Sequence, residues 1–357
     1  MQEMGSIILS CGILFTDESD YALWRSIFPH IKANELYRSQ MGLNKYYDDK
    51  YNNFALAMSK NGDWKSAEEL QVQVMNMRKK LLGAEHPGTL TSMEYLALTY
   101  NNLGKWDEAE ELEVQVMHIR KKLFGAEHPD TLISMGNLAE IYYYQGKWNE
   151  AEELEVQVMH MRKKLLGAEH PDTLTSMGNL ALTYNDLGKW NEAEELEVQV
   201  MHMRKKLLGT EHPDTLISMG NLAEIYHYQG KWNEAEELEV QVMDMRKRLF
   251  GAEHPDTLRS MGNIALTYNN LGRWNEAEEL EVQVMHMSKK LLGTEHPDTL
   301  TSMGNLALTY NNLGKWNEAE ELQVQVMHMS KKLFGAEHPD TLRSMGDLAA
   351  IYCVQGK

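Results

Sequence analysis

The 357-residue sequence predicts an all-α solenoid, and its periodicity is the main reason. Seven tryptophans, from Trp64 to Trp316, follow one another at intervals of 42 residues. His-Pro dipeptides keep the same interval from His86 to His338, and no segment of the repeats alternates apolar and polar residues as a strand would. Repeats of this length are typical of proteins in which each unit buries its apolar face against its neighbours. The length of the chain therefore reports a copy number and not a number of globular domains.

The unit at residues 148–189 predicts two helices, and we name the one that begins at Trp148 helix B. Its apolar positions recur at steps of three and four, as one face of a helix requires. This stripe consists of Ala151, Leu154, Val158, Met161 and Leu165. Glutamates crowd the first turns and basic residues the last turn, and Gly167 follows, which suits the helix dipole and a glycine stop.

The second segment of the unit, which we name helix A, begins at Pro171 and ends before Gly188. Proline followed by aspartate suits the first turn of a helix, where a missing N–H costs nothing. Its apolar stripe consists of Leu174, Met177, Ala181 and Tyr184. Because both connections are short, we expect helices A and B to be antiparallel neighbours.

Several residues of each unit resemble the signature of the tetratricopeptide repeat. They are Leu180, Ala181, Tyr184, Gly188, Trp190, Ala193 and Pro213. The 42-residue form resembles the repeats of kinesin light chain, and the sequence AEELEVQVM…LGAEHPDTLTSMGNLA is similar to the arrays in fungal STAND (NLR-like) ATPases. The resemblance covers about residues 46–357 and implies an all-α, right-handed α-solenoid (superhelix). Ala181, Glu197 and Val200 depart from the family pattern, which implies slightly altered packing and not another fold.

The ends of the chain differ from the array. Residues 1–45 do not fit the period and predict a short helical segment, a remnant or cap of the array at 46–357, with an apolar contact face. This face consists of Trp24, Ile27, Phe28 and Ile31. The last helix A stops at Gly356 without a helix B, which predicts either a truncated chain or end-to-end self-association through the uncapped repeat.

Comparison of the copies locates a variable stripe on helix A. In the unit above it comprises Thr175, Gly178, Leu182, Asn185 and Asp186. The resemblance implies that this stripe lines the concave groove where tetratricopeptide proteins bind peptides, so that variable side chains stand on a constant scaffold. The predicted groove residues are Asn137, Asn179, Asn221, Asn263, Asn305, Glu140, Tyr143, Tyr144, Glu224, His227, Tyr228, Arg259 and Arg343.

The asparagines among them recur at one height of the groove. An amide both donates and accepts, so this ladder could hold an extended peptide backbone whatever its sequence. The alternative is that each asparagine bonds a neighbouring helix. The aromatic residues, with His227, would supply anchors of the kind that dominate interface energetics, or would instead be spacers in solvent.

Composition argues against several classes of function. The net charge of −18 opposes a nucleic-acid or anionic membrane partner, and no apolar run approaches the roughly 20 residues of a membrane helix. Two cysteines, Cys11 and Cys353, exclude a disulfide framework and favour a reducing, cytoplasmic setting. The histidines recur a whole repeat apart without metal-ligand pairs, and no phosphate-binding loop, nucleophile elbow or kinase motif occurs. We therefore expect no metal, no cofactor and no enzymatic activity.

The prediction is a non-enzymatic scaffold that binds a protein or peptide segment in its groove. By resemblance, it would be the recognition or regulatory repeat region of an NLR-like protein. The alternatives are a cargo adaptor similar to kinesin light chain and a structural spacer or self-association module without a groove ligand.

Overall fold

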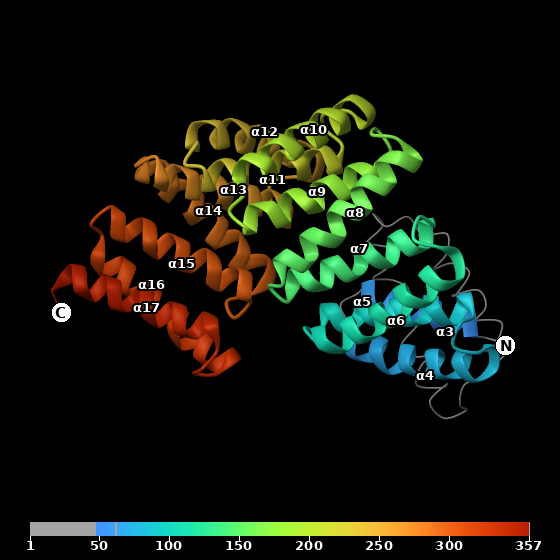
Figure 1. The fold of residues 1–357 in the computed structure, drawn as a ribbon. Coiled ribbons are helices and arrows are strands. Elements are labelled where there is room, and N and C mark those ends of the chain that lie inside the picture. Colours follow the sequence, from blue (N-terminus) through green and yellow to red (C-terminus); the bar gives the residue numbers. More distant parts are fainter. Residues whose placement is uncertain (1–47, 61–62, 357) are drawn as a thin grey trace. The chain divides into compact units, whose positions relative to one another are not determined.

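A computed structural model describes residues 48–60 and 63–356, and every regular element in these ranges is an α-helix. The segment predicted at residues 1–45, with its contact face at Trp24, Ile27, Phe28 and Ile31, lies outside the described residues. The chain forms two compact units, one holding α3 to α9 and the other α10 to α17 (Figure 1). We describe each unit by itself.

Helices of two kinds alternate, as the repeat predicts. The helices of type A are α3 (Asp48–Lys60), α5 (Pro87–Asn102), α7 (Pro129–Tyr144), α9 (Pro171–Asp186), α11 (Pro213–Tyr228), α13 (Pro255–Asn270), α15 (Pro297–Asn312) and α17 (Pro339–Gln355). The helices of type B are α4 (Trp64–Leu82), α6 (Trp106–Phe124), α8 (Trp148–Leu166), α10 (Trp190–Leu208), α12 (Trp232–Phe250), α14 (Trp274–Leu292) and α16 (Trp316–Phe334).

The connection from helix B to helix A is fixed by its own side chains. Gly209 ends α10 with a φ of 91°, a conformation that favours glycine. His212 caps α11, because its Nδ1 accepts a hydrogen bond from the backbone N–H of Asp214 at 3.2 Å. Thr215 Oγ1 donates to the carbonyl oxygen of Gly209 at 2.8 Å and closes the turn. The recurring His-Pro histidines are therefore helix caps, and this structural role explains their period.

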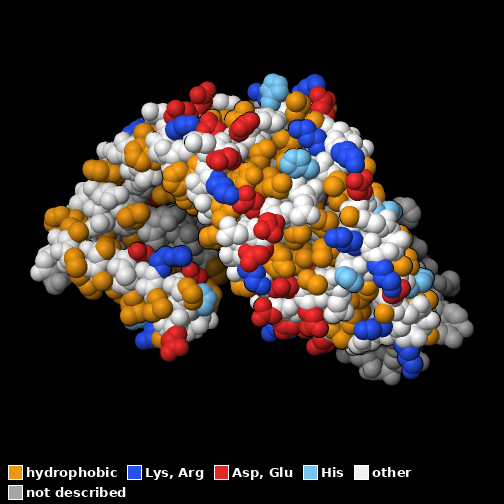
Figure 2. All heavy atoms as spheres, in the orientation of Figure 1, with side chains coloured by type: hydrophobic (Ala, Val, Ile, Leu, Met, Phe, Trp, Pro, Cys, Tyr) orange, Lys and Arg blue, Asp and Glu red, His pale blue; other side chains and the backbone are white. Residues whose placement is uncertain are grey.

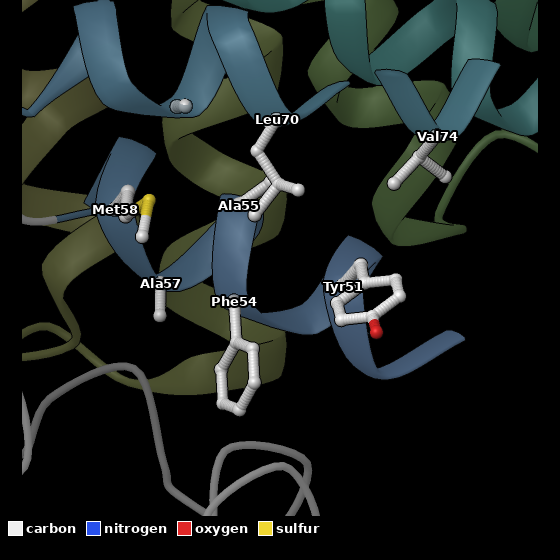
Figure 3. Packing of buried hydrophobic residues seen from close by; sticks show 8 residues of the cluster. Tyr51, Phe54, Ala55, Ala57, Met58, Leu70 and Val74 are labelled. Atoms are coloured by element: carbon white, nitrogen blue, oxygen red, sulfur yellow. The ribbon is translucent and has the colours of Figure 1, made fainter. Parts of the chain in front are cut away.

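The core consists of small clusters, one at each meeting of helices. Figure 3 shows the first, in which Phe54 and Met58 of α3 lie with Leu70 and Val74 of α4. Later clusters repeat one composition: Leu216 and Met219 of α11 pack against Val242 of α12. This arrangement is typical of solenoids, where burial is local to neighbouring helices.

Burial confirms most of the two predicted stripes. On α8, Ala151 and Val158 are buried, whereas Leu154 and Met161 are half-buried. Leu165 was placed on the same stripe, but it is 44% exposed, because it lies in the last turn beyond the helices that cover the middle of α8. On α9 the stripe is buried except for a half-buried Tyr184.

Ion pairs tie each repeat to the one before it. Lys231, just before α12, donates to Glu194 Oε2 of α10 at 2.7 Å, and its Nζ lies 5.2 Å from the ring centroid of Tyr226. The same pairing, always between residues 37 positions apart, recurs at Lys105 with Glu68, Lys147 with Glu110, Arg273 with Glu236 and Lys315 with Glu278. These contacts lie partly in solvent, so each contributes modestly and less at high salt.

Candidate peptide-binding groove

The variable stripe of helix A leaves large apolar side chains in solvent. Ile217 of α11 is 47% exposed, Leu266 of α13 is 47% exposed and Leu308 of α15 is 49% exposed. Figure 2 shows such hydrophobic side chains interspersed with charged ones on the face in view. Adaptable apolar positions between polar ones suit recognition of another chain.

The fourth position of the stripe is buried or half-buried in most copies, whereas Cys353 of the last copy is exposed. Asn185 is only 6% exposed, and His227 Nε2 lies 2.6 Å from Thr267 Oγ1 of α13. In the next copy, Asn269 Nδ2 donates to Thr309 Oγ1 at 2.7 Å. The side chains of His227 and Asn269 therefore join consecutive A helices of the second unit. His227 is half-buried at this contact, and its role as a groove anchor stays a prediction.

The five asparagines of the ladder divide into two groups. Asn137 Nδ2 donates to Glu113 Oε1 of α6 at 3.4 Å, a contact of the kind that the alternative interpretation predicts. Asn221 lies near Glu197 and helps to keep the pKa of that carboxyl from rising further. Asn179, Asn263 and Asn305 are exposed and open to a ligand.

A ladder of buried acids runs under the asparagines, which the sequence analysis did not identify. Its members stand at one position of helix B and are at most 6% exposed. They are Glu113, Glu155, Glu197, Glu239 and Glu281. Burial raises the pKa of Glu113 to about 8 and those of the other four to about 7. The signal that could have revealed them is their register, because Glu197 stands between Ala193 and Val200 on the apolar face of α10.

At both ends of the ladder the acid is replaced by glutamine, Gln71 and Gln323. In the last copy, Asp347 also replaces the asparagine of helix A, and Gln323 Nε2 donates to Asp347 Oδ2 at 3.4 Å. The amide and the carboxylate have thus exchanged helices relative to Glu113 and Asn137. This exchange preserves one donor and one acceptor at the position.

The remaining predicted groove residues have distinct surroundings. Tyr143 and Tyr144 meet edge to face with ring centroids 5.5 Å apart, and Tyr228 stacks on Trp190 at 6.5 Å. Glu140 is half-buried, which raises the pKa of its carboxyl, whereas Glu224 is exposed. The two arginines pair with aspartates of their own helices: Arg259 with Asp256 at 3.5 Å and Arg343 with Asp340 at 3.3 Å.

Three pockets open along helix A. One of about 260 Å³ is lined by Glu113, Asn137 and Glu140. The other two lie in the second unit: one of about 270 Å³ includes Arg259, Asn263, Glu281 and Asn305, and one of about 280 Å³ includes Asn305, Gln323, Arg343 and Asp347. Together with acids and amides of the B helices, six of the thirteen predicted groove residues line these pockets: Asn137, Glu140, Arg259, Asn263, Asn305 and Arg343.

The part of the chain that the structure describes contains neither a cluster of metal-binding side chains nor a helix that could span a membrane. Within residues 48–60 and 63–356, no three side chains of His, Cys, Asp or Glu are grouped so as to hold a metal ion. No helix among the described residues is long and apolar enough to cross a membrane.

Comparison with known proteins adds two kinds of finding. Two family models described as tetratricopeptide repeat match the chain, one at residues 48–122 and 94–164, the other at 173–214, 215–256, 257–298 and 299–340. A search of curated proteins gives no match. Among solved structures, TPR-like repeats of a kinesin light chain from Podosopora anserina are 39% identical, with a TM-score of 0.52 over 58% of this chain and 99% of that chain.

Two more distant structures share the fold alone. BtubC (BKLC) from P. vanneervenii is 17% identical, with a TM-score of 0.56 over 66% of this chain and 94% of that chain. A Rap protein complexed with Competence and Sporulation Factor is 11% identical, with a TM-score of 0.58 over 99% of both chains.

Proposed function

Because the chain belongs to the tetratricopeptide-repeat family, we propose that it is a protein-interaction scaffold that holds an extended peptide segment along its A helices. The observation that carries this proposal is the coincidence of three features along the A helices: exposed apolar residues, exposed asparagines, and pockets whose lining includes acids and amides. Apolar residues would bury side chains of the peptide, and the amides would bond its backbone.

In this proposal the exposed asparagines form hydrogen bonds with the backbone of the bound peptide. Asn263 and Asn305 line the same pocket from consecutive A helices, so one segment can reach both amides. Asn137 and Asn221 are offset toward the buried acids and contribute less in this scheme. From the resemblance of its repeat sequence we further propose a place in the recognition region of an NLR-like protein, and a cargo adaptor similar to kinesin light chain is the alternative.

The test uses a displayed library of random peptides, selected against the whole chain. Peptides that bind the groove should bind about tenfold more weakly to the double variant Asn263→Ala and Asn305→Ala, since two hydrogen bonds are lost. Asn275→Ala with Asn317→Ala is the matched control, because these asparagines are exposed on the B helices of the same repeats. Selected peptides that tolerate the first pair of changes as well as the second would contradict the proposal.

A second candidate is self-association, and one observation favours it. Leu342 and Met345 of α17 are 55% and 48% exposed, whereas the corresponding Leu300 and Met303 of α15 are 4% and 0% exposed. The occupant we propose for this apolar face is a second copy of the chain. Light scattering should show a mass that rises with concentration in the native chain and stays monomeric in Leu342→Glu. A native chain that is monomeric at every concentration would dismiss this candidate.

A further inference from the structure

Five repeats hold an arginine of their own in the same place, buried in two of them and half-buried in three. Arg246 of α12 illustrates the arrangement: its Nη1 donates to Ser260 Oγ at 2.8 Å and to the carbonyl oxygen of Asp256 at 3.4 Å, both on α13. The equivalent arginines, each with the serine 14 residues later, are Arg78 with Ser92, Arg120 with Ser134, Arg162 with Ser176 and Arg204 with Ser218. A serine hydroxyl and a carbonyl oxygen at the start of helix A therefore form a binding site for a guanidinium group.

The last two B helices lack this arginine. Ser288 of α14 and Ser330 of α16 stand in its place, and both are buried. The receiving groups remain, since Asp298 and Ser302 correspond to Asp256 and Ser260. Ser302 Oγ now donates to the carbonyl oxygen of Thr299, at 2.8 Å, whereas Ser260 Oγ donates to that of Asp256.

A pocket opens where the arginine is missing. Its volume is about 270 Å³, and its lining includes Ser288, Asp298 and Ser302. The acid of the buried ladder, Glu281, lies in the same lining, is 3% exposed and has an Oε2 without a hydrogen-bond partner. A buried carboxylate oxygen without a partner is costly, and a cationic donor would satisfy it.

We propose that the pocket beside Ser288 binds the arginine side chain of a partner peptide, in the way that five other repeats bind an arginine of their own. The guanidinium donates to Ser302 Oγ and the Asp298 carbonyl, and it faces the Glu281 carboxylate. Its planar fork of donors can serve several acceptors at once, which the single ammonium of lysine does less well. This inference rests on the proposed groove, because Asn263 and Asn305 line the same pocket.

The pocket also holds a cation of the chain itself, Arg259. Its side chain is 70% exposed and pairs with Asp256 at 3.5 Å, so its charge is offset and directed toward solvent. The adjacent pocket of about 280 Å³ has a similar lining, which includes Ser330, Ser344 and the acid Asp347. A peptide with two suitably spaced arginines would therefore occupy both pockets.

The test is a titration of the whole chain with acetyl-arginine amide, followed by NMR of ¹³C-methyl methionine. Met261 reports on the site, because it packs with the lining residues Leu258 and Val284. Saturable shifts of Met261 are expected with the arginine probe, and at least tenfold weaker binding with acetyl-citrulline amide, which has the same shape without the charge. Equal responses to the two probes would overturn the proposal.

Two variants make the result specific. Ser288→Arg restores the arrangement of the other repeats and should abolish the response at Met261, whereas Glu281→Gln, the residue found at Gln323, should weaken binding at least tenfold. A response that survives Ser288→Arg would also overturn the inference. Failure of the arginine probe, with asparagine variants that still lose selected peptides, would leave the proposed groove intact and remove only the arginine pocket.

Discussion

Replacement of Glu197 by glutamine is expected to raise the free energy of unfolding at pH 8 by about 1–3 kcal/mol and to raise it much less at pH 5. Glu197 is fully buried on α10, and burial raises the pKa of its carboxyl from 4.5 to about 7, opposed by Ser218, Arg204 and Asn221. Urea unfolding followed by circular dichroism at both pH values measures the difference.

The direction of this pH dependence follows from whether the folded or the unfolded chain holds the proton on Glu197. The folded chain keeps the proton on Glu197 up to about pH 7, whereas the unfolded chain releases it near pH 4.5. The native state therefore binds more protons between these values, and its stability falls as the pH rises through this window. Glutamine does not titrate, so the variant escapes this loss. Near pH 4.5 and below, a neutral acid and an amide are nearly equivalent.

The chain contains its own precedent for this substitution, since Gln71 and Gln323 occupy the same position at 3% and 1% exposure. Glu195→Gln is the matched control, because Glu195 is an exposed acid of the same helix. An equal gain in stability at pH 5 and pH 8 would show that removal of a titrating proton is not the cause, and a loss at pH 8 would contradict the assignment.

Replacement of Arg120 by serine should lower the free energy of unfolding by about 2–4 kcal/mol, because it leaves a largely buried carboxylate unpaired. Arg120 of α6 pairs with Glu94 of α5 through both terminal nitrogens, with Nη2 at 2.7 Å from Glu94 Oε2. Burial already raises the pKa of Glu94, and Arg120 opposes that shift. Without the guanidinium, the acid must be protonated or remain charged without its partner.

A second variant separates this pairing from simple loss of contacts. Gly262 and Ser288 occupy the same two positions in a later copy, and glycine also stands at the first position in the copies with Arg162, Arg204 and Arg246. The double variant Glu94→Gly and Arg120→Ser should therefore recover at least half of the lost stability, although glycine within a helix costs about 1 kcal/mol. Arg246→Ser is the control, since Gly220 faces it and only its two hydrogen bonds are lost. A double variant as unstable as Arg120→Ser would contradict the argument.

The periodicity of the sequence was sufficient to predict the helices and their order. Every helix from α4 to α17 begins at the predicted tryptophan or proline, because the capping histidine and the terminal glycine act within a few residues of the chain. The exposure of single positions was harder to predict. The position of His227 varies among copies in the manner of a surface residue, but the A helix of the next repeat lies against it, as the 2.6 Å contact of His227 with Thr267 shows.

The buried acids and the arginine pocket depended on contacts between helices. A glutamate within an otherwise apolar stripe departs from the family pattern, but the sequence does not show what lies opposite it. Likewise, the sequence alone gives no sign that the replacement of Arg246 by Ser288 at the equivalent position creates a binding site. The structure shows that Ser260 and the Asp256 carbonyl contact the arginine in one copy, whereas a pocket lies beside Ser288 in the next.

The ion pair of Lys231 with Glu194, repeated along each unit at a constant separation of 37 residues, has a consequence for how the array can change in length. Each described junction of this kind joins a basic residue, lysine or Arg273, to a glutamate, so this contact is the same on either side of a repeat. Loss or gain of one whole 42-residue unit would rejoin matched surfaces and leave the remaining junctions as they were. The array can thus change in length by whole repeats, while the variable positions of helix A keep each copy distinct.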